Sequence, residues 1–368
     1  MTAAEIGTGL RRGPPMTRAG MLAAAAVLCV GLALAGALVG PSALSLSQIA
    51  AALREAAFGL ETSDPAATAI VMHIRLPRVL LGAAVGAALA CSGCALQGLF
   101  RNPLADPGLI GVTAGAATGA VAAIVVGDLI FQGVPNSLRA YLLPLSAFLG
   151  AGLVTLVVFQ FARAGAAAGE IGRGMSVTLL LLAGVAINAI AAAMIGGFVY
   201  VSDDQQLRDL TFWTMGGLGA ADWTSTGVAC LAIAAATALL LRFDRALDLL
   251  QLGERGAFHA GLDVERVKGR IGLLSALAVG AATAVAGPIG FVGLVAPHLA
   301  RLIAGPSHRI AIPLSALIGA ALTLLADLCV RMIAPPAEPP IGLATSLIGG
   351  PFFLWLLLRR ARRGGWRV

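Results

Sequence analysis

Residues 75 to 115 read RLPRVLLGAAVGAALACSGCALQGLFRNPLADPGLIGVTAG, and this stretch decides the fold. The run from Val79 to Leu99 carries no charge and follows two arginines. At ~1.5 Å per residue, a helix of this length spans a hydrocarbon core of ~30 Å. The segment from Phe100 to Gly108 holds two prolines, which lack a backbone donor, and Asn and Asp side chains that bond nearby backbone. The sequence therefore predicts a chain that crosses a membrane, reverses and crosses again.

The composition extends this conclusion to the whole chain. Hydrophobic residues make up 58% and charged residues 12% of the 368 residues, and the mean hydropathy is +0.91. The surface of a water-soluble globule of this size needs more polar residues. The 47 glycines suit helices that pack closely in lipid. The net charge of +7 is scattered between apolar runs, so we expect no nucleic-acid partner. The predicted fold class is an all-α polytopic membrane protein.

Hydropathy predicts ten membrane spans and an uncleaved first span with the N-terminus inside. Most of the 25 lysines and arginines then fall on the cytoplasmic side, as the positive-inside rule requires. Both termini are predicted to be cytoplasmic. The predicted spans are 21–40, 79–99, 108–130, 140–162, 177–200, 223–241, 270–286, 289–304, 310–333 and 341–358.

A short internal repeat supports this count. Ala84-Val-Gly-Ala-Ala88 recurs as Ala278-Val-Gly-Ala-Ala282, and Pro103 matches Pro297 at the same offset. The two copies begin spans two and seven, which run in opposite directions because they are five crossings apart. The sequence thus predicts an inverted repeat, with spans two to five and seven to ten as its halves.

The segment 243–269 is the longest charged stretch between two spans. Its leucines and small residues recur at helical spacing among charges, which predicts two short amphipathic helices, with a solvated loop as the alternative. The only lysine, Lys268, is not part of a G-x-x-x-x-G-K-[ST] motif. We therefore predict that the chain is not an enzyme and that a partner binds and hydrolyses ATP.

Cysteines and histidines point to no metal site. Cys91 and Cys94 have metal-ligand spacing, but no second pair or nearby histidine completes a set. Histidine is a common haem ligand. Each of the four histidines is nevertheless predicted to be structural or at the surface, and no permanently bound cofactor is expected; they are His73, His259, His298 and His308.

The Arg75-Leu-Pro-Arg78 motif, Gln97-Gly98 and the turn from Asn102 to Gly108 together resemble the permease subunits of ABC importers for vitamin B12, iron-siderophores and haem. The resemblance covers the chain from about residue 20 to its end. It implies one transmembrane permease domain, residues 1–368, in the bacterial inner membrane. It also implies a homodimer with two ATPase subunits and a periplasmic binding protein. Segment 243–269 would be the coupling segment that docks on the ATPase.

The resemblance further implies roles for individual residues. Outward-facing arginines would receive acidic residues of the binding protein: Arg75, Arg78 and Arg331. Gate or pathway residues would lie along the central path between spans five and ten of the two subunits: Asn102, Leu104, Ser176, Thr178, Ser202, Asp203, Phe352 and Phe353. Contacts to the ATPase would come from Leu252, Gly253, Glu254, Ala257 and Gly261.

The cargo is predicted to be haem. Leu99 to Gly108, Gly169 to Met175 and Asp203 to Trp213 look most like the haem branch of these permeases. Ferric siderophore and cobalamin remain alternatives within the same class. An ion-coupled secondary carrier is an alternative from another class, but such proteins place ionisable residues inside spans, and here Asp327 is the main example.

Overall fold

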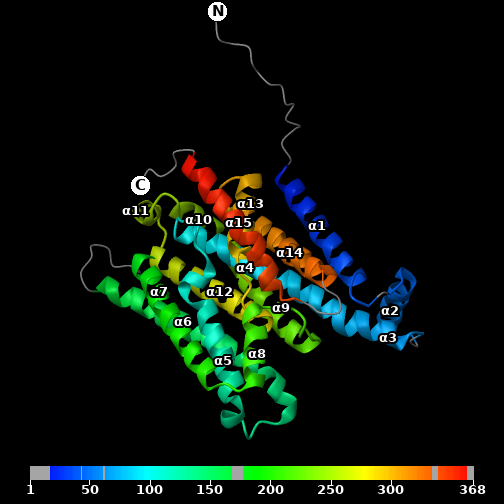
Figure 1. The fold of residues 1–368 in the computed structure, drawn as a ribbon. Coiled ribbons are helices and arrows are strands. Elements are labelled where there is room, and N and C mark those ends of the chain that lie inside the picture. The colour runs from blue at the N-terminus through cyan, green and yellow to red at the C-terminus, as the bar shows by residue number, and fades with distance from the viewer. Residues whose placement is uncertain (1–16, 43, 61–62, 168–176, 334–338, 363–368) are drawn as a thin grey trace, which may run out of the picture.

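The computed structural model describes residues 17–42, 44–60, 63–167, 177–333 and 339–362, and all regular structure in these ranges is helical (Figure 1). The helices that correspond to spans are α1 (Arg18–Leu38), α4 (Leu76–Leu99), α5 (Val112–Ile130), α6 (Asn136–Ala167), α7 (Val177–Val201), α9 (Trp223–Leu240), α12 (Val264–Ala286), α13 (Val292–Ala304), α14 (His308–Ile333) and α15 (Ile341–Arg362). The shorter elements are α2 (Leu46–Phe58), α3 (Pro65–Ala69), η1 (Ile70–Arg75), η2 (Pro107–Ile110), α8 (Asp204–Met215), η3 (Leu241–Phe243), α10 (Asp244–Leu250) and α11 (Glu254–His259).

The predicted polytopic helical fold is confirmed. Among the described residues, 7 helices are long and apolar enough to cross a membrane, and α5, α13 and α15 are shorter apolar helices. Helix α12 begins at Val264, ahead of the predicted start at 270. Helix α13 has 13 residues and is only ~20 Å long, so the non-helical segment before it must cross the remaining depth.

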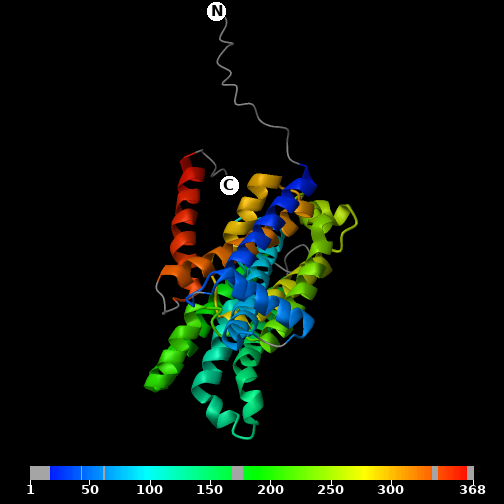
Figure 2. The ribbon, with the colours of Figure 1, turned by 90° about the vertical axis from the view of Figure 1, so that its right-hand side faces the viewer.

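Helix α4 lies at the centre of the bundle, with α14, α12, α9 and α13 packed around it (Figures 1 and 2). In the most apolar part of the span that contains α4, 78% of residues are buried. The corresponding shares are 11% in α1 and 17% in α7. Helices α1 and α7 therefore present most of their apolar surface to lipid or to a partner.

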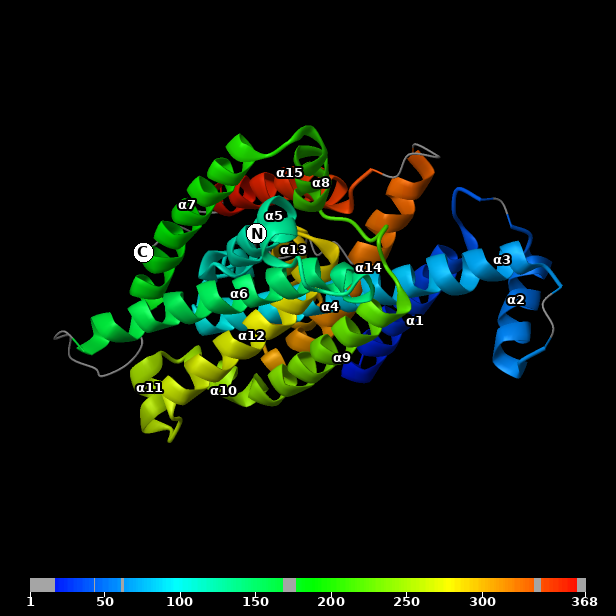
Figure 3. The same cartoon turned by 90° about the horizontal axis from the view of Figure 1, so that it is seen from below.

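The helix that contains α4 extends beyond the predicted span at its outer end. One continuous helical run covers Pro65 to Leu99, with the π-helix η1 in its middle. Pro77 lies within this run, lacks an N–H and cannot complete a regular α-helical ladder. The wider π-helical turn, in which Leu76 N–H donates to Val71 C=O, keeps the chain helical here. Sequence reasoning also missed α2, which packs beside this extension (Figure 3).

Glycines allow the helix backbones to touch at the two closest contacts of α4. A Cβ atom on Gly86 would lie 2.2 Å from the Gly319 carbonyl oxygen of α14. A Cβ atom on Gly93 would lie 2.0 Å from the Gly293 carbonyl oxygen of α13. No side chain fits at these positions, and this confirms that glycine serves close packing between spans.

We expect Gly86→Val to destabilise the fold by about 1–3 kcal/mol or more, because the helices must separate to admit the side chain. The midpoint of thermal unfolding in detergent measures this loss. Gly227→Val on α9 is the matched control, since a Cβ atom there has no neighbour within 4 Å. Equal midpoints for the two variants would contradict the close packing of α4 on α14.

The two halves of the chain are arranged as the inverted repeat predicts. Helices α4 and α12 run in opposite directions (Figure 1), and α4 packs on α14 as α12 packs on α6. Gly111 before α5 and Phe291 before α13 both have positive φ, of 80° and 66°. The predicted match of Pro103 with Pro297 is wrong, because Pro103 lies in a turn and Pro297 lies inside α13.

Candidate functional site

The turn after α4 is held in one shape by its own polar groups. Asn102 N–H donates to Gln97 C=O over 3.1 Å, with Arg101 in the left-handed region at φ 50°, which closes the helix end. Asn102 Oδ1 accepts the Leu104 N–H at 2.9 Å, and both residues are half-buried. The Asp106 carboxylate accepts the Gly108 N–H at 2.8 Å. Burial raises the pKa of Asp106, although this hydrogen bond opposes the shift. This turn carries the predicted gate residues Asn102 and Leu104, which the resemblance places at a cytoplasmic, inner gate, and its shape is thus fixed by its own hydrogen bonds.

Helix α7 supports this turn from one side. The Asn188 side-chain amide donates to Gly108 C=O at 3.2 Å, and Gly184 packs directly on the Leu109 backbone. Thr178 is exposed in the first turn of α7, and no hydrogen bond joins it to Asn102 among the described residues. Ser176 lies outside the described residues. The predicted gate role of Ser176 and Thr178 therefore stays a prediction.

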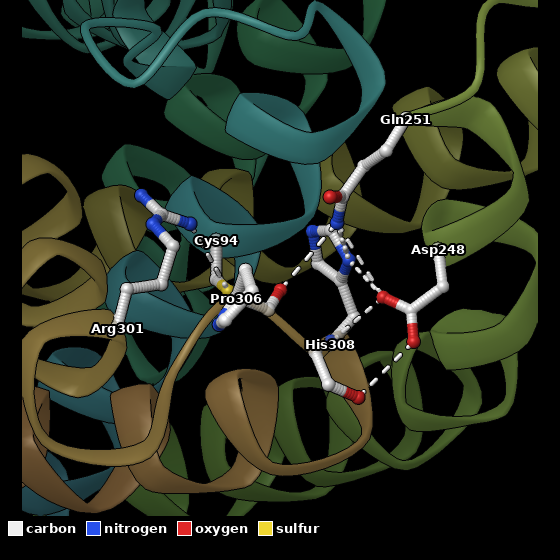
Figure 4. A network of polar contacts seen from close by, with 7 residues as sticks. Cys94, Asp248, Gln251, Arg301, Pro306 and His308 are labelled. Carbon is white, nitrogen blue, oxygen red and sulfur yellow. Dashed lines mark hydrogen bonds and ion pairs between the residues drawn. The ribbon is translucent and has the colours of Figure 1, made fainter.

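A polar network that sequence reasoning missed lies beside the turn (Figure 4). The Asp248 carboxylate on α10 accepts the His308 backbone N–H at 2.9 Å and lies 2.8 Å from His308 Nδ1. The Gln251 amide nitrogen lies 3.1 Å from the same Nδ1. The buried His308 ring packs so closely on Gly98 that a Cβ there would lie 2.3 Å from Nε2. This network ties α10 to the start of α14 and the end of α4.

A second link crosses the same inner end of the bundle. Arg301 of α13 donates to the Gln97 side-chain oxygen of α4, and its other Nη lies 3.9 Å from Cys94 Sγ. His308 and Arg301 line a cavity of about 290 Å³ together with Gln97, Gly98, Arg101, Pro103, Gln251 and Pro306. The only signal in the sequence for these links was the Gln97-Gly98 pair.

The segment 243–269 forms two short helices, α10 and α11, and this prediction is confirmed. Their buried faces include Leu247, Leu250 and Ala257. Leu252 and Phe258 are exposed at 72% and 67% of their surface. These apolar side chains lie at the end of the bundle that is predicted to be cytoplasmic. Water would cover them there unless a partner protein binds.

Glycines and one ion pair shape this segment. Gly253 and Gly261 have positive φ values of 94° and 87°, which only glycine adopts without strain. Glu254 Oε1 lies 2.5 Å from the Nζ of Lys268, a residue of α12. The Lys268 side chain is almost completely buried. The predicted Leu252 is therefore available to a partner, whereas Glu254 holds α11 on α12 and Ala257 is buried in the core.

The three predicted docking arginines are buried in the single chain, so the outward exposure that was expected is not seen, and their docking role stays a prediction. Arg75, Arg78 and Arg331 have 3%, 5% and 3% of their surface exposed. Arg75 donates to the carbonyl oxygens of Ala37, Leu38 and Ser42 at the end of α1.

The other two arginines converge on one carboxylate. Arg78 Nη2 lies 2.8 Å from Asp327 Oδ1, and Arg331 Nη2 lies 2.8 Å from Asp327 Oδ2. Arg331 also donates to the carbonyl oxygens of Gly36 and Val39. This arginine cluster, Arg75, Arg78, Arg331 and Asp327, holds the end of α1 where its C-terminal carbonyls carry partial negative charge. A docking role would require these groups to leave their partners.

The remaining predicted pathway residues lie between α7 and α8 and on α15. Ser202 donates to Phe198 C=O at the end of α7, and exposed Asp203 caps α8 by accepting the Gln206 N–H at 2.8 Å. Phe352 and Phe353 are half-buried on α15. Phe352 lies edge-on to His298, with ring centroids 6.5 Å apart, and 6.0 Å from the Trp355 ring.

Comparisons with known proteins agree with this architecture. Residues 25–359 match the FecCD transport family. The hemin transport system permease protein of Yersinia pestis is 46% identical over 94% of this chain and 97% of its own length. The cobalamin import system permease protein of Halobacterium salinarum is 38% identical over 93% of this chain and 96% of its own. The vitamin B12 import system permease protein of Salmonella typhi is 41% identical over 79% of this chain and 84% of its own length.

A solved structure agrees as well. A metal-chelate type ABC transporter in an inward-facing conformation superposes with a TM-score of 0.78 and 31% identity, over 92% of this chain and 99% of the other. The chain therefore belongs to the FecCD transport family.

Proposed function

We propose that this chain is the permease subunit of an ABC importer that moves haem from the periplasm to the cytoplasm. The observation that carries the proposal is the 46% identity to a hemin permease over nearly the full length of both chains. Cobalamin is the second candidate, supported by the corrinoid permeases at 38% and 41% identity. Ferric siderophores are a further alternative.

The proposed working form is a homodimer with two ATPase subunits and a periplasmic binding protein. Helices α7 and α15 form one edge of the subunit (Figure 3), and this edge would face the second copy. Leu182, Val185, Ile190 and Met194 leave much of α7 apolar and uncovered. The path between two such edges would then pass Phe352 and Ser202.

The proposed orientation places α10 and α11 in the cytoplasm. The first residue of α1 and the last turn of α15 lie at the same end as α10 and α11 (Figure 1). This end also holds most of the basic residues, which supports cytoplasmic termini. The arginine cluster then lies at the periplasmic end.

The network around His308 supports a route from the ATPase to the inner gate. A partner that pushes on Leu252 would move α10, and Asp248 would carry this movement to the start of α14. His308 packs on Gly98, two residues before the turn that contains Asn102. Movement of α10 would therefore reach the inner gate through direct contacts.

Haem uptake by the complete transporter in proteoliposomes tests the cargo. We expect ATP-dependent accumulation of haem when the cognate binding protein is present, and no competition from cobalamin or a ferric siderophore. Accumulation of cobalamin without haem would reject the haem proposal and retain the importer.

We expect His298→Ala to change the rate of haem uptake by less than about tenfold, because edge-on packing on Phe352 is its described contact and cargo in transit must be released. Initial uptake rates in proteoliposomes measure this, with exposed His73→Ala as the control. A larger loss specific to His298, with normal assembly and an altered haem absorbance spectrum, would indicate axial ligation.

A further inference from the structure

A groove in the described part of the chain lies between α5, α6 and α12, and these helices pack against one another (Figures 1 and 3). Its volume is about 960 Å³, at the upper end of the ~300–1,000 Å³ of ligand sites. Gly152 leaves it open, since a Cβ atom there would have no neighbour within 4 Å, and Leu149, Leu153 and Leu156 form its apolar wall. Nothing in the proposed transport cycle uses this groove.

The groove runs along α6. Its lining extends from Ser146 to Arg163, which corresponds to ~25 Å of helix, close to the ~30 Å of a hydrocarbon core. Ile130 and Phe131 lie at its outer end. The length and the apolar wall fit acyl chains.

A cation marks the inner end of the groove. The guanidinium of Arg163 lies over Gly269 of α12, where a Cβ atom would approach within 3.2 Å of Nη2. Arg163 is exposed, and no carboxylate in the described ranges pairs with it. Gln160, one helical turn earlier, adds a polar side chain to the lining. The inner leaflet is where anionic phospholipids meet basic residues at the ends of spans.

We propose that this groove binds an anionic phospholipid of the inner leaflet, with its acyl chains against α6 and its phosphate on Arg163. The site lies next to Lys268, which holds α11 through Glu254. The lipid therefore adjoins the segment that docks the ATPase. This inference does not depend on the identity of the cargo.

Native mass spectrometry of the complete transporter tests the site, with dioleoylphosphatidylglycerol and dioleoylphosphatidylcholine as probes. The two lipids share their acyl chains and differ in net charge. We expect the wild-type protein to bind the anionic lipid about fivefold more tightly, and Arg163→Gln to abolish that preference. Arg139→Gln, at the outer end of the same helix and exposed, should retain it.

A second variant tests the apolar part of the groove. Gly152 lines the groove, and a Cβ atom on it would have no neighbour within 4 Å, so Gly152→Leu fills the groove without a clash. It should weaken binding of both lipids. Retention of the preference in Arg163→Gln, equal loss in Arg139→Gln, or unchanged binding in Gly152→Leu would each overturn the proposal. Loss of subunit association in Gly152→Leu, with no lipid bound to the wild-type protein, would assign the groove to a second copy.

Discussion

Asp327→Asn is expected to destabilise the fold by about 3–5 kcal/mol, the cost of breaking a buried ion pair by removing one partner. The Asp327 side chain is 1% exposed and bonds the guanidinium groups of Arg78 and Arg331. Without this carboxylate, several positive charges remain buried together at the end of the bundle that we propose to be periplasmic. We expect a lower midpoint of thermal unfolding in detergent and faster hydrogen exchange in α1, which is little buried elsewhere.

The control for this variant is Asp209→Asn. Asp209 is exposed on α8, where it accepts a hydrogen bond from Gln205, and its loss should change stability by less than about 0.5 kcal/mol. If Asp327→Asn kept the wild-type midpoint and instead lost only affinity for the binding protein, the arginines would serve docking, as the sequence had predicted.

Leu252→Ser combined with Phe258→Ser is expected to weaken binding of the ATPase by at least about tenfold. Both side chains are large, apolar and mostly exposed beside two short helices whose other faces are buried. A side chain that anchors an interface contributes about 2 kcal/mol or more when it is truncated. Co-purification of the ATPase with the permease, followed by ATP hydrolysis in proteoliposomes, measures the effect.

The matched control is Phe58→Ser, because Phe58 is 76% exposed on α2 at the opposite end of the bundle. It should leave binding of the ATPase unchanged. Asp248→Ala separates docking from transmission, since it cuts the bonds from α10 to His308 while leaving Leu252 in place. That variant should still bind the ATPase normally. It should transport less cargo for each ATP that is hydrolysed. A full complement of ATPase on the double serine variant would place the docking surface elsewhere.

Local patterns in the sequence were sufficient for the spans and for the two coupling helices. A span is a property of about 20 consecutive residues, and α10 and α11 follow from the spacing of leucines and small residues among charges, so neither requires knowledge of distant contacts. The outer helix α2 was missed because Leu46 to Phe58 is too short and too polar for a span. The predicted second span began directly after Arg78. The π-helical turn that accommodates Pro77, and so lets the helix start earlier, could not be foreseen from the sequence.

The burial of the arginines could not be predicted from the same patterns. Arg78 bonds a carboxylate 249 positions away, and Arg75 bonds backbone oxygens of α1, which no side-chain pattern encodes. One signal was available. An ionisable residue inside a span, here Asp327, needs a partner, and the nearest basic residue one helical turn away is Arg331.

The shortness of α13 has a consequence for how the bundle can move. The non-helical segment before it lies at membrane depth, where no water replaces a lost backbone hydrogen bond. Beside this segment, backbone groups of neighbouring elements bond one another: Gly217 N–H donates to Ala286 C=O at 2.8 Å, and Gly342 N–H donates to Gly216 C=O at 3.3 Å. Breaking either bond leaves two polar groups in a dry environment. The ends of α12 and α8 and the start of α15 are therefore joined by backbone hydrogen bonds that the bilayer cannot replace, so we expect this junction to stay closed when the helices around it move.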